Sequence, residues 1–162
     1  GPRLRGLAAG ALLHDVGKIG IPDAILHKAG RLTDEEFSVI REHPGRGWEI
    51  LRFTFGSDVE SMVIRHHHEK WDGSGYPDRL AGEAIPLEAR IAAVAAVYDA
   101  LRSNRSYRVP MTPEEAAAII RKDAGSHFDP RCVEAFLAVR AQWERSYAAA
   151  HVAYIERREV PA

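Results

Sequence analysis

Residues 86–101 read PLEARIAAVAAVYDAL, and this stretch decides the fold class. Large apolar side chains recur through it in steps of four and three residues, namely Leu87, Ile91, Val94, Tyr98 and Leu101. That spacing places them on one face of an α-helix, and a continuous apolar face is buried against neighbouring elements. The proline at the start suits a first helical turn, where the N–H that it lacks would be unpaired in any case. The stretch therefore predicts a helix that carries a buried stripe.

Further helices are indicated on both sides of this stretch. Helix starts of the Ser/Thr-x-x-Glu or X-Pro type are recognisable at Thr33, Ser57, Thr112 and Asp129. An apolar pattern from Leu4 to Leu12 predicts a first helix, and glycines and prolines predict loops over residues 17–30 and 69–84. No alternating strand pattern competes, so we predict an all-α helical bundle.

The composition limits the class of protein. The chain has 162 residues and a formal net charge of −1, as expected for one globular domain. This balance excludes the strongly basic surface of duplex-binding proteins, so no nucleic-acid polymer is expected as a partner. The longest apolar run, Ile91 to Tyr98, is less than half of a membrane-spanning helix, so no membrane contact is expected. The single cysteine, Cys132, cannot form an internal disulfide, and we expect a cytoplasmic protein.

Histidine is the unusual residue, with eight copies, and imidazole is the commonest metal ligand. Three places form a pattern: His14-Asp15 at the end of a helix, His43 between two helices, and His67-His68 at another helix end. Neighbours on a helix point about 100° apart, so adjacent ligand pairs suit a site with more than one ion. Without thiolates, iron or manganese is favoured over structural zinc. Two such ions can hold a hydroxide and a phosphate together for phosphoester hydrolysis.

The same residues allow a simpler interpretation. A His-Asp dipeptide is common as a surface or capping pair, and residues 66–68 could form a solvated, histidine-rich helix end. His27, His66, His127 and His151 are expected at the surface or at helix ends. The spacing alone leaves the metal site and the solvated surface both open.

Longer sequence motifs help to decide between a metal site and a solvated surface. In order along the chain they are LLHDVGKIGIPD at 12–23, HP at 43–44, HHEKWDGSGYP at 67–77, IP at 85–86 and ARI at 89–91. Together they resemble the HD-GYP domain, a subfamily of the HD phosphohydrolases, from about Arg5 to Leu137. The resemblance implies an all-α bundle in which two or three iron or manganese ions hydrolyse cyclic di-GMP to the linear dinucleotide or to GMP. Residues 3–162 are then expected to be one HD-GYP domain, and residues 1–2 the remnant of a tag.

The resemblance also implies roles for single residues. The metal ligands of the family fall on His14, Asp15, His43, His67 and His68. Lys18 falls on the lysine that reaches the scissile phosphate, and Lys18 and Asp15 are the expected catalytic residues. Substrate-binding positions fall on Lys18, on the loop tyrosine Tyr76 and on Arg105 and Arg108. The simpler alternatives are that Tyr76 only packs the loop and that the two arginines are solvated.

Two departures from the family pattern weaken the expected centre. The family has a metal-binding aspartate three residues before Asp99, and here that position is Ala96, whose methyl group cannot bind a metal. Asp99, about one helical turn further along, is expected only to support a ligand or a water. The family also has two helices before Leu4, with a histidine and often a glutamate that complete the cage, and this sequence begins after them. We therefore expect partial metal occupancy.

The function implied by the resemblance is a metal-dependent cyclic di-GMP phosphodiesterase, which we expect to be impaired by Ala96 and by truncation of the upstream helices. Its alternative is a degenerate HD-GYP module that binds a nucleotide or a protein without cleaving it. In the family, the loop Gly73–Pro77 suggests a contact with a GGDEF-type cyclase domain. An HD-superfamily nucleotidase for another substrate is a third option, and the Gly-Tyr-Pro loop argues against it. The oligomeric state is left open.

Overall fold

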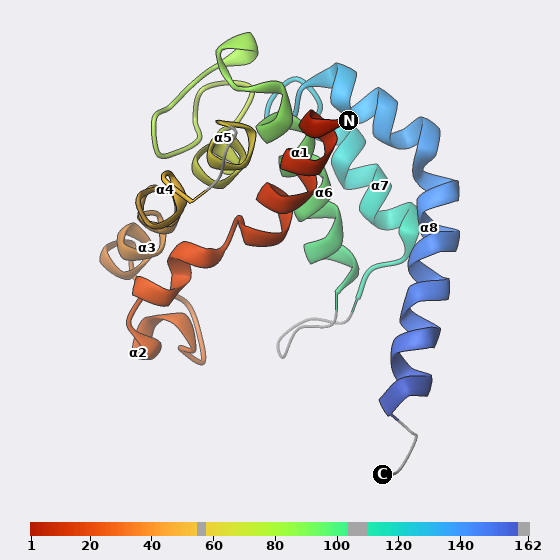
Figure 1. Cartoon of the computed structure of the whole chain (residues 1–162), viewed down its shortest axis with the longest axis horizontal. Coiled ribbons are helices and arrows are strands. Elements are labelled where there is room, and N and C mark those ends of the chain that lie inside the picture. Colours follow the sequence, from red (N-terminus) through yellow and green to blue (C-terminus); the bar gives the residue numbers. More distant parts are fainter. Residues whose placement is uncertain (55–57, 104–109, 159–162) are drawn as a thin grey trace.

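The computed structural model describes residues 1–54, 58–103 and 110–158, and within these ranges the chain is helical without a β-strand (Figure 1). The α-helices are α1 (Pro2–Leu13), α2 (Asp23–Leu26), α3 (Asp34–Ile40), α4 (His43–Leu51), α5 (Asp58–His66), α6 (Leu87–Arg102), α7 (Pro113–Lys122) and α8 (Pro130–Arg158). Two short 3₁₀ helices are η1 (Val16–Gly20) and η2 (Gly82–Ala84). The predicted all-α class is confirmed. None of the described helices combines the length and the apolar character that crossing a membrane requires.

The helices form two neighbouring groups. In Figure 1, α6 lies between α1 and α7, and α8 runs along the outer edge, while α3, α4 and α5 lie on the opposite side. The long helix α6 contacts α1, α5, α7 and α8, so it joins the two groups. The core on the α6–α8 side is centred on Tyr98, Ile120 and Phe128, each exposed by 1% or less.

Most of the expected helix boundaries are confirmed. Thr33 and Thr112 each accept a hydrogen bond from the N–H three residues later, and the Glu at that position closes a full capping box. Helix α8 begins at Pro130, directly after Asp129. The cap expected at Ser57 lies outside the described residues. The loop expected over residues 17–30 instead contains α2 and most of η1, because single helical turns need no long periodic pattern.

Two expectations about apolar faces are wrong. Leu87 and Ile91, expected in the buried stripe of α6, are 40% and 39% exposed, because only the C-terminal half of the stripe faces the core. Leu4 and Leu12 are also exposed, and the buried residues of α1 are Gly6 and Gly10. The missing side chains let α1 lie close to α5: a Cβ on Gly10 would come within 2.8 Å of Val63 Cβ.

A second close approach joins η1 to α4. Gly17 is buried, and a Cβ there would overlap the carbonyl oxygen of His43 and lie 2.5 Å from the backbone nitrogen of Gly47. Both neighbours are backbone atoms, which cannot move aside as a flexible side chain can. Only glycine therefore allows the chain just after α1 to lie on the first turn of α4.

We predict that Gly17→Ala destabilises the protein by about 3 kcal/mol, because the methyl group forces η1 and α4 apart. The matched control is Gly45→Ala in α4, where a Cβ would meet nothing within 4 Å. Alanine has the higher helix propensity, so this control should gain about 0.5–1 kcal/mol. Urea unfolding followed by circular dichroism measures both values, and equal stability of the two variants would contradict the close approach.

Candidate metal centre

The ends of three helices bring four potential metal ligands together. Asp15 follows α1, His43 is the first residue of α4, and His67 and His68 directly follow α5. Each offers one ligand atom, and these atoms all lie within 4.8 Å of one another. His43 and His67 are buried, whereas His68 and Asp15 are partly exposed. The cluster therefore opens to solvent on the side of Asp15.

Three imidazoles share one backbone arrangement that fixes the direction of each ring. The Nδ1 atom lies close to the carbonyl oxygen three residues earlier, at 2.7 Å for His14, 2.7 Å for His43 and 2.9 Å for His67. A carbonyl can only accept, so these contacts assign a proton to Nδ1 and leave Nε2 as the ligand atom. Such hydrogen bonds are typical of metal-binding histidines, because they fix the tautomer and raise the basicity of the ring.

The Nε2 atom of His43 lies close to two other acceptor atoms. His43 Nε2 lies 3.3 Å from His67 Nε2 and 3.3 Å from Asp15 Oδ1. With Nδ1 protonated, a neutral imidazole presents a lone pair at Nε2, and lone pairs at this distance repel unless a proton or a cation lies among them. The donor set of imidazole nitrogens and a carboxylate oxygen therefore fits a divalent metal ion.

The protonation states also suit metal binding. Burial lowers the pKa of His67 to about 3 and that of His68 to about 2, so both rings are neutral near pH 7. Burial alone would raise the pKa of Asp15, but the contacts with His43 and Lys18 outweigh it and hold the pKa well below its usual range. Two neutral imidazoles and an ionised carboxylate need lose no proton before they bind a cation.

His14 and Lys18 lie at the edge of the cluster. His14 Nε2 is 3.4 Å from Asp15 Oδ2, and its ring centroid is 4.8 Å from that of His67, although its ligand atoms fall outside the 4.8 Å group. Lys18 Nζ donates to Asp15 Oδ2 at 2.6 Å, and its side chain is 36% exposed. The lysine therefore places a positive charge where a ligand would enter.

The loop after α5 covers the cluster with Tyr76. Its ring stacks on His68, with centroids 4.8 Å apart and planes 20° apart, and its N–H donates to the His68 carbonyl at 3.2 Å. Burial raises the pKa of Tyr76 to about 12, so the phenol keeps its proton and can donate a hydrogen bond. Tyr76 thus lies beside one member of the cluster, and its expected contact with the substrate remains a prediction.

Sequence reasoning missed the residue that holds this loop, Glu69. Its side chain is fully buried, and its two oxygens accept the N–H of Asp78 at 2.7 Å and of Leu80 at 3.1 Å. Together with His66 and Asp78 it forms a second group with metal-ligand atoms, but Asp78 is bound by both donors of Arg65 at 2.8 Å. These oxygens are used within the protein, so the group stabilises the loop. In the sequence, Glu69 simply follows two histidines, and no sequence pattern distinguishes a glutamate that holds a loop from one that binds a metal.

The remaining predicted positions lie elsewhere. Asp99 is exposed, and its carboxylate accepts from the Ser103 hydroxyl at 3.4 Å. Among the described residues, no hydrogen bond or ion pair joins Asp99 to the cluster. Ala96 is half-buried on α6 and offers no ligand atom. Arg105 and Arg108 lie outside the described residues, so their expected contact with phosphate remains a prediction.

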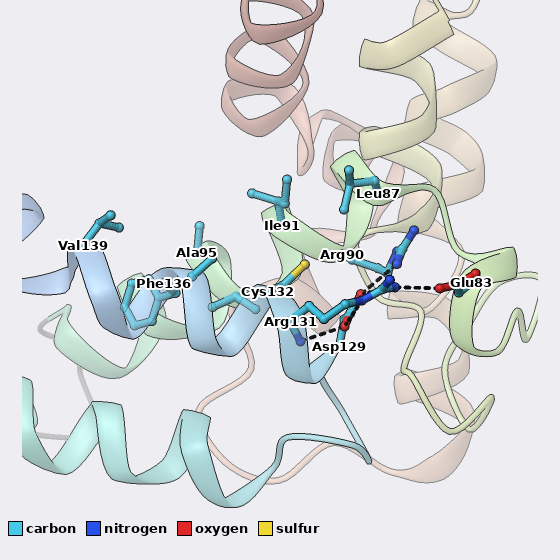
Figure 2. Close-up of a pocket in the computed structure, with 12 residues that line it drawn as sticks. Glu83, Leu87, Arg90, Ile91, Ala95, Asp129, Arg131, Cys132, Phe136 and Val139 are labelled. Carbon is cyan, nitrogen blue, oxygen red and sulfur yellow. Dashed lines mark hydrogen bonds and ion pairs between the residues drawn. The ribbon is translucent and has the colours of Figure 1, made fainter.

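A separate hollow of about 700 Å³ lies between α6 and α8 (Figure 2). Most of its lining is apolar, including the exposed side chains of Leu87, Ile91 and Val139. Its charged groups lie at one end and are paired with one another: Arg90 with Asp129 at 2.7 Å, and Arg131 with Glu83 at 2.9 Å (Figure 2). The hollow contains one thiol, Cys132, but burial raises its pKa and thus disfavours the reactive thiolate. The candidate site is therefore the histidine cluster.

Comparisons with known proteins found relatives that are named phosphodiesterases of cyclic dinucleotides. The response regulator RpfG of Xanthomonas campestris pv. campestris, named a cyclic di-GMP phosphodiesterase, is 50% identical over 137 residues, which are 83% of this chain and 36% of that protein. A cyclic di-GMP phosphodiesterase of Vibrio cholerae is 51% identical over 140 residues, 82% of this chain and 28% of that protein. The crystal structure of the cyclic GMP-AMP specific phosphodiesterase V-cGAP3 of V. cholerae matches with a TM-score of 0.65 and 25% identity, over 86% of this chain and 39% of that one. The chain thus spans about a third of the length of these curated relatives.

The match also holds at the level of the family. The family model described as HD domain matches residues 2–132, which contain all four members of the ligand cluster. The HD-GYP blocks quoted from the sequence lie within the same range. The resemblance expected from the sequence is confirmed, and the chain belongs to the HD domain family, within its HD-GYP subfamily.

Proposed function

We propose that this chain is the catalytic domain of a metal-dependent phosphodiesterase that hydrolyses cyclic di-GMP to the linear dinucleotide or to GMP. The observation that carries the proposal is the convergence of Asp15, His43, His67 and His68 within 4.8 Å. The names of the relatives, which are phosphodiesterases of cyclic dinucleotides, support the substrate class. A cytoplasmic location fits this substrate, a bacterial second messenger.

Two or three iron or manganese ions are the proposed cofactor, held by the four clustered ligands and by His14. Bound there, the ions supply a hydroxide at neutral pH and neutralise charge on the phosphate. Asp15 would offer both of its oxygens to the metal site, because they face different neighbours: Oδ1 faces His43, whereas Oδ2 faces His14 and Lys18. The buried ring of His67 closes the inner wall of the site against water.

The other residues act on the substrate. Lys18 stabilises the negative charge that builds up on the phosphate during attack, and it is available for this because it lies at the open side of the cluster. Tyr76 covers His68 with its ring and keeps its phenol proton, so it can donate a hydrogen bond to the substrate. Arg105 and Arg108 are proposed to bind the phosphates, as the family pattern implies.

A second candidate function rests on Ala96. If the carboxylate that the family places there is needed to hold the second ion, the chain binds a nucleotide or a protein partner without cleaving it. The partner proposed for this alternative is a GGDEF-type cyclase domain at the loop Gly73–Pro77. The loop is accessible for such a contact, since Ser74 is exposed and Gly73 is partly exposed.

We predict that purified chain reconstituted with Mn²⁺ or Fe²⁺ cleaves cyclic di-GMP and that His67→Ala abolishes cleavage and lowers metal affinity by about 10-fold or more. Loss of a buried ligand leaves a cavity and an incomplete donor set. The control is His27→Ala, which removes an exposed imidazole outside the cluster. Metal analysis and chromatography of the nucleotides measure the two effects. Cleavage by His67→Ala would disprove the site, whereas binding without cleavage by the parent chain would support the second candidate.

Ala96→Asp is expected to raise metal affinity and hydrolysis by about 10-fold, because it returns a carboxylate to the position where the family has one. The parent chain should hold fewer than the two ions of a complete binuclear site. Ala95→Asp is the matched control, since it adds the same charge to the neighbouring residue, which points about 100° away around the helix. Equal gains in both variants would show that added charge alone is responsible. Two or more tightly held ions in the parent would show that the carboxylate is not needed.

Lys18→Met should lower kcat by about 100-fold, because the methionine keeps the length of the side chain and removes its positive charge. Metal content should stay unchanged, since lysine is not among the proposed ligands. Lys122→Met, at the exposed end of α7, serves as the control. Steady-state kinetics with cyclic di-GMP checks the effect, and an unchanged kcat would remove Lys18 from the proposed mechanism.

A further inference from the structure

A polar pocket of about 680 Å³ lies beside the metal cluster, on the other side of the loop that carries Tyr76. Its walls come from α3 and α4 and from loop residues 73–77 and 79. Of the residues assigned to the metal centre, only the covering Tyr76 lines it, and none of the proposed ligands does. The pocket has the size of a small-molecule site and is separate from the cluster.

Four arginines line this pocket, and two of them are already used within the protein. Arg46 donates to Glu42 at 2.6 Å and to the carbonyl of Gly20, and Arg65 is held by both oxygens of Asp78. The guanidinium of Arg41 lies over the rings of Phe37 and Tyr76. Within the described part of the chain, the side chains of Arg41 and Arg79 have no hydrogen-bond or ion-pair partner.

The remaining acid in the lining, Glu49, forms no ion pair with either of these arginines within the described residues. It lies on the exposed side of α4, two turns after the helix start, and its charge acts on Arg65. The two unused guanidinium groups, Arg41 and Arg79, therefore leave the pocket with positive charge that no internal partner balances. An anion from solution is the natural partner for such groups.

The position of Arg41 connects the pocket to the metal cluster. Its guanidinium carbon lies 4.7 Å from the ring centroid of Phe37 and 5.5 Å from that of Tyr76. Tyr76 in turn stacks on His68, one of the clustered ligands. An anion bound by Arg41 would thus lie one aromatic ring away from the metal site.

We propose that this pocket binds the phosphate group of a small phosphorylated ligand, with Arg41 and Arg79 as its donors. Each guanidinium presents planar, paired N–H groups that match two phosphate oxygens, and unlike lysine it holds them in a fixed geometry. The pocket is larger than a phosphate ion, so it leaves room for the rest of the ligand beside Tyr76. The proposal does not depend on the phosphodiesterase function, because it uses none of the metal ligands.

Calorimetric titration of chelator-treated, desalted protein with inorganic phosphate tests the pocket, because phosphate then has no metal to bind. We expect saturable binding by the parent and a loss of at least about 10-fold in affinity in Arg41→Gln and in Arg79→Gln, each of which removes a charge-assisted donor. Arg121→Gln, which removes an exposed arginine of α7, should bind like the parent. A titration with GMP distinguishes the ligands: tighter binding than phosphate assigns a nucleotide, and equal binding assigns phosphate alone.

Three results would overturn the proposal. The first is absence of phosphate binding to the parent, and the second is unchanged binding in both arginine variants. The third is loss of binding in Lys18→Met with normal binding in Arg79→Gln, because the phosphate would then occupy the histidine cluster. Arg79 is exposed, so its replacement leaves the core intact, and circular dichroism confirms that the variant is folded. Cyclic di-GMP hydrolysis plays no part in this readout, so its failure leaves this test unaffected.

Discussion

The backbone of Gly17 lies directly on the first turn of α4, and the arrangement of the site depends on this contact. Asp15 and His43 are far apart in the sequence, yet Asp15 Oδ1 lies 3.3 Å from His43 Nε2. The reason is that the close approach at Gly17 holds the chain after α1 against α4. A similar approach at Gly10 brings α1 against α5, whose end carries His67. Two backbone contacts therefore set the distances between three ligand positions before any side-chain interaction contributes.

The cluster built on these contacts is rich in lone pairs and poor in negative charge. Burial keeps His67 and His68 neutral, so they donate electron pairs without offsetting charge, and Asp15 is the one ionised carboxylate in the group. Each divalent ion brings twice the charge that one carboxylate balances, and an uncompensated charge in a partly buried site is costly. A further carboxylate would help more than a further imidazole, and this charge argument is the basis of the gain proposed for Ala96→Asp.

The sequence predicted the helices and the ligand types better than it predicted their surroundings. Capping boxes and periodic stripes are local signals, so Thr33 and Thr112 could be recognised from the sequence alone. The exposure of Leu87 could not, because it depends on which half of α6 has a neighbour. Glu69 could not be assigned either, since its partners are backbone N–H groups of a loop whose path is fixed only in the folded protein. Tyr76 was found through a motif, and its contact with Arg41 required the structure.

The loop that carries Tyr76 contacts both the cluster and the pocket lined by Arg41 and Arg79. Hydrogen bonds hold this loop in place, so it does not transmit a movement from the pocket to the cluster. Glu69 binds the N–H groups of Asp78 and Leu80, and the N–H of Trp71 donates to the His127 carbonyl at 3.0 Å, so both ends of the turn are fixed. An anion bound in the pocket therefore affects the cluster through electrostatic interactions. Arg41 lies over the ring of Tyr76, and Tyr76 stacks on His68. Neutralising Arg41 therefore removes a positive charge close to the cluster and makes the site more favourable for a cation. Anion binding in the pocket and cation binding in the cluster should then favour each other, since coupling between two sites is reciprocal.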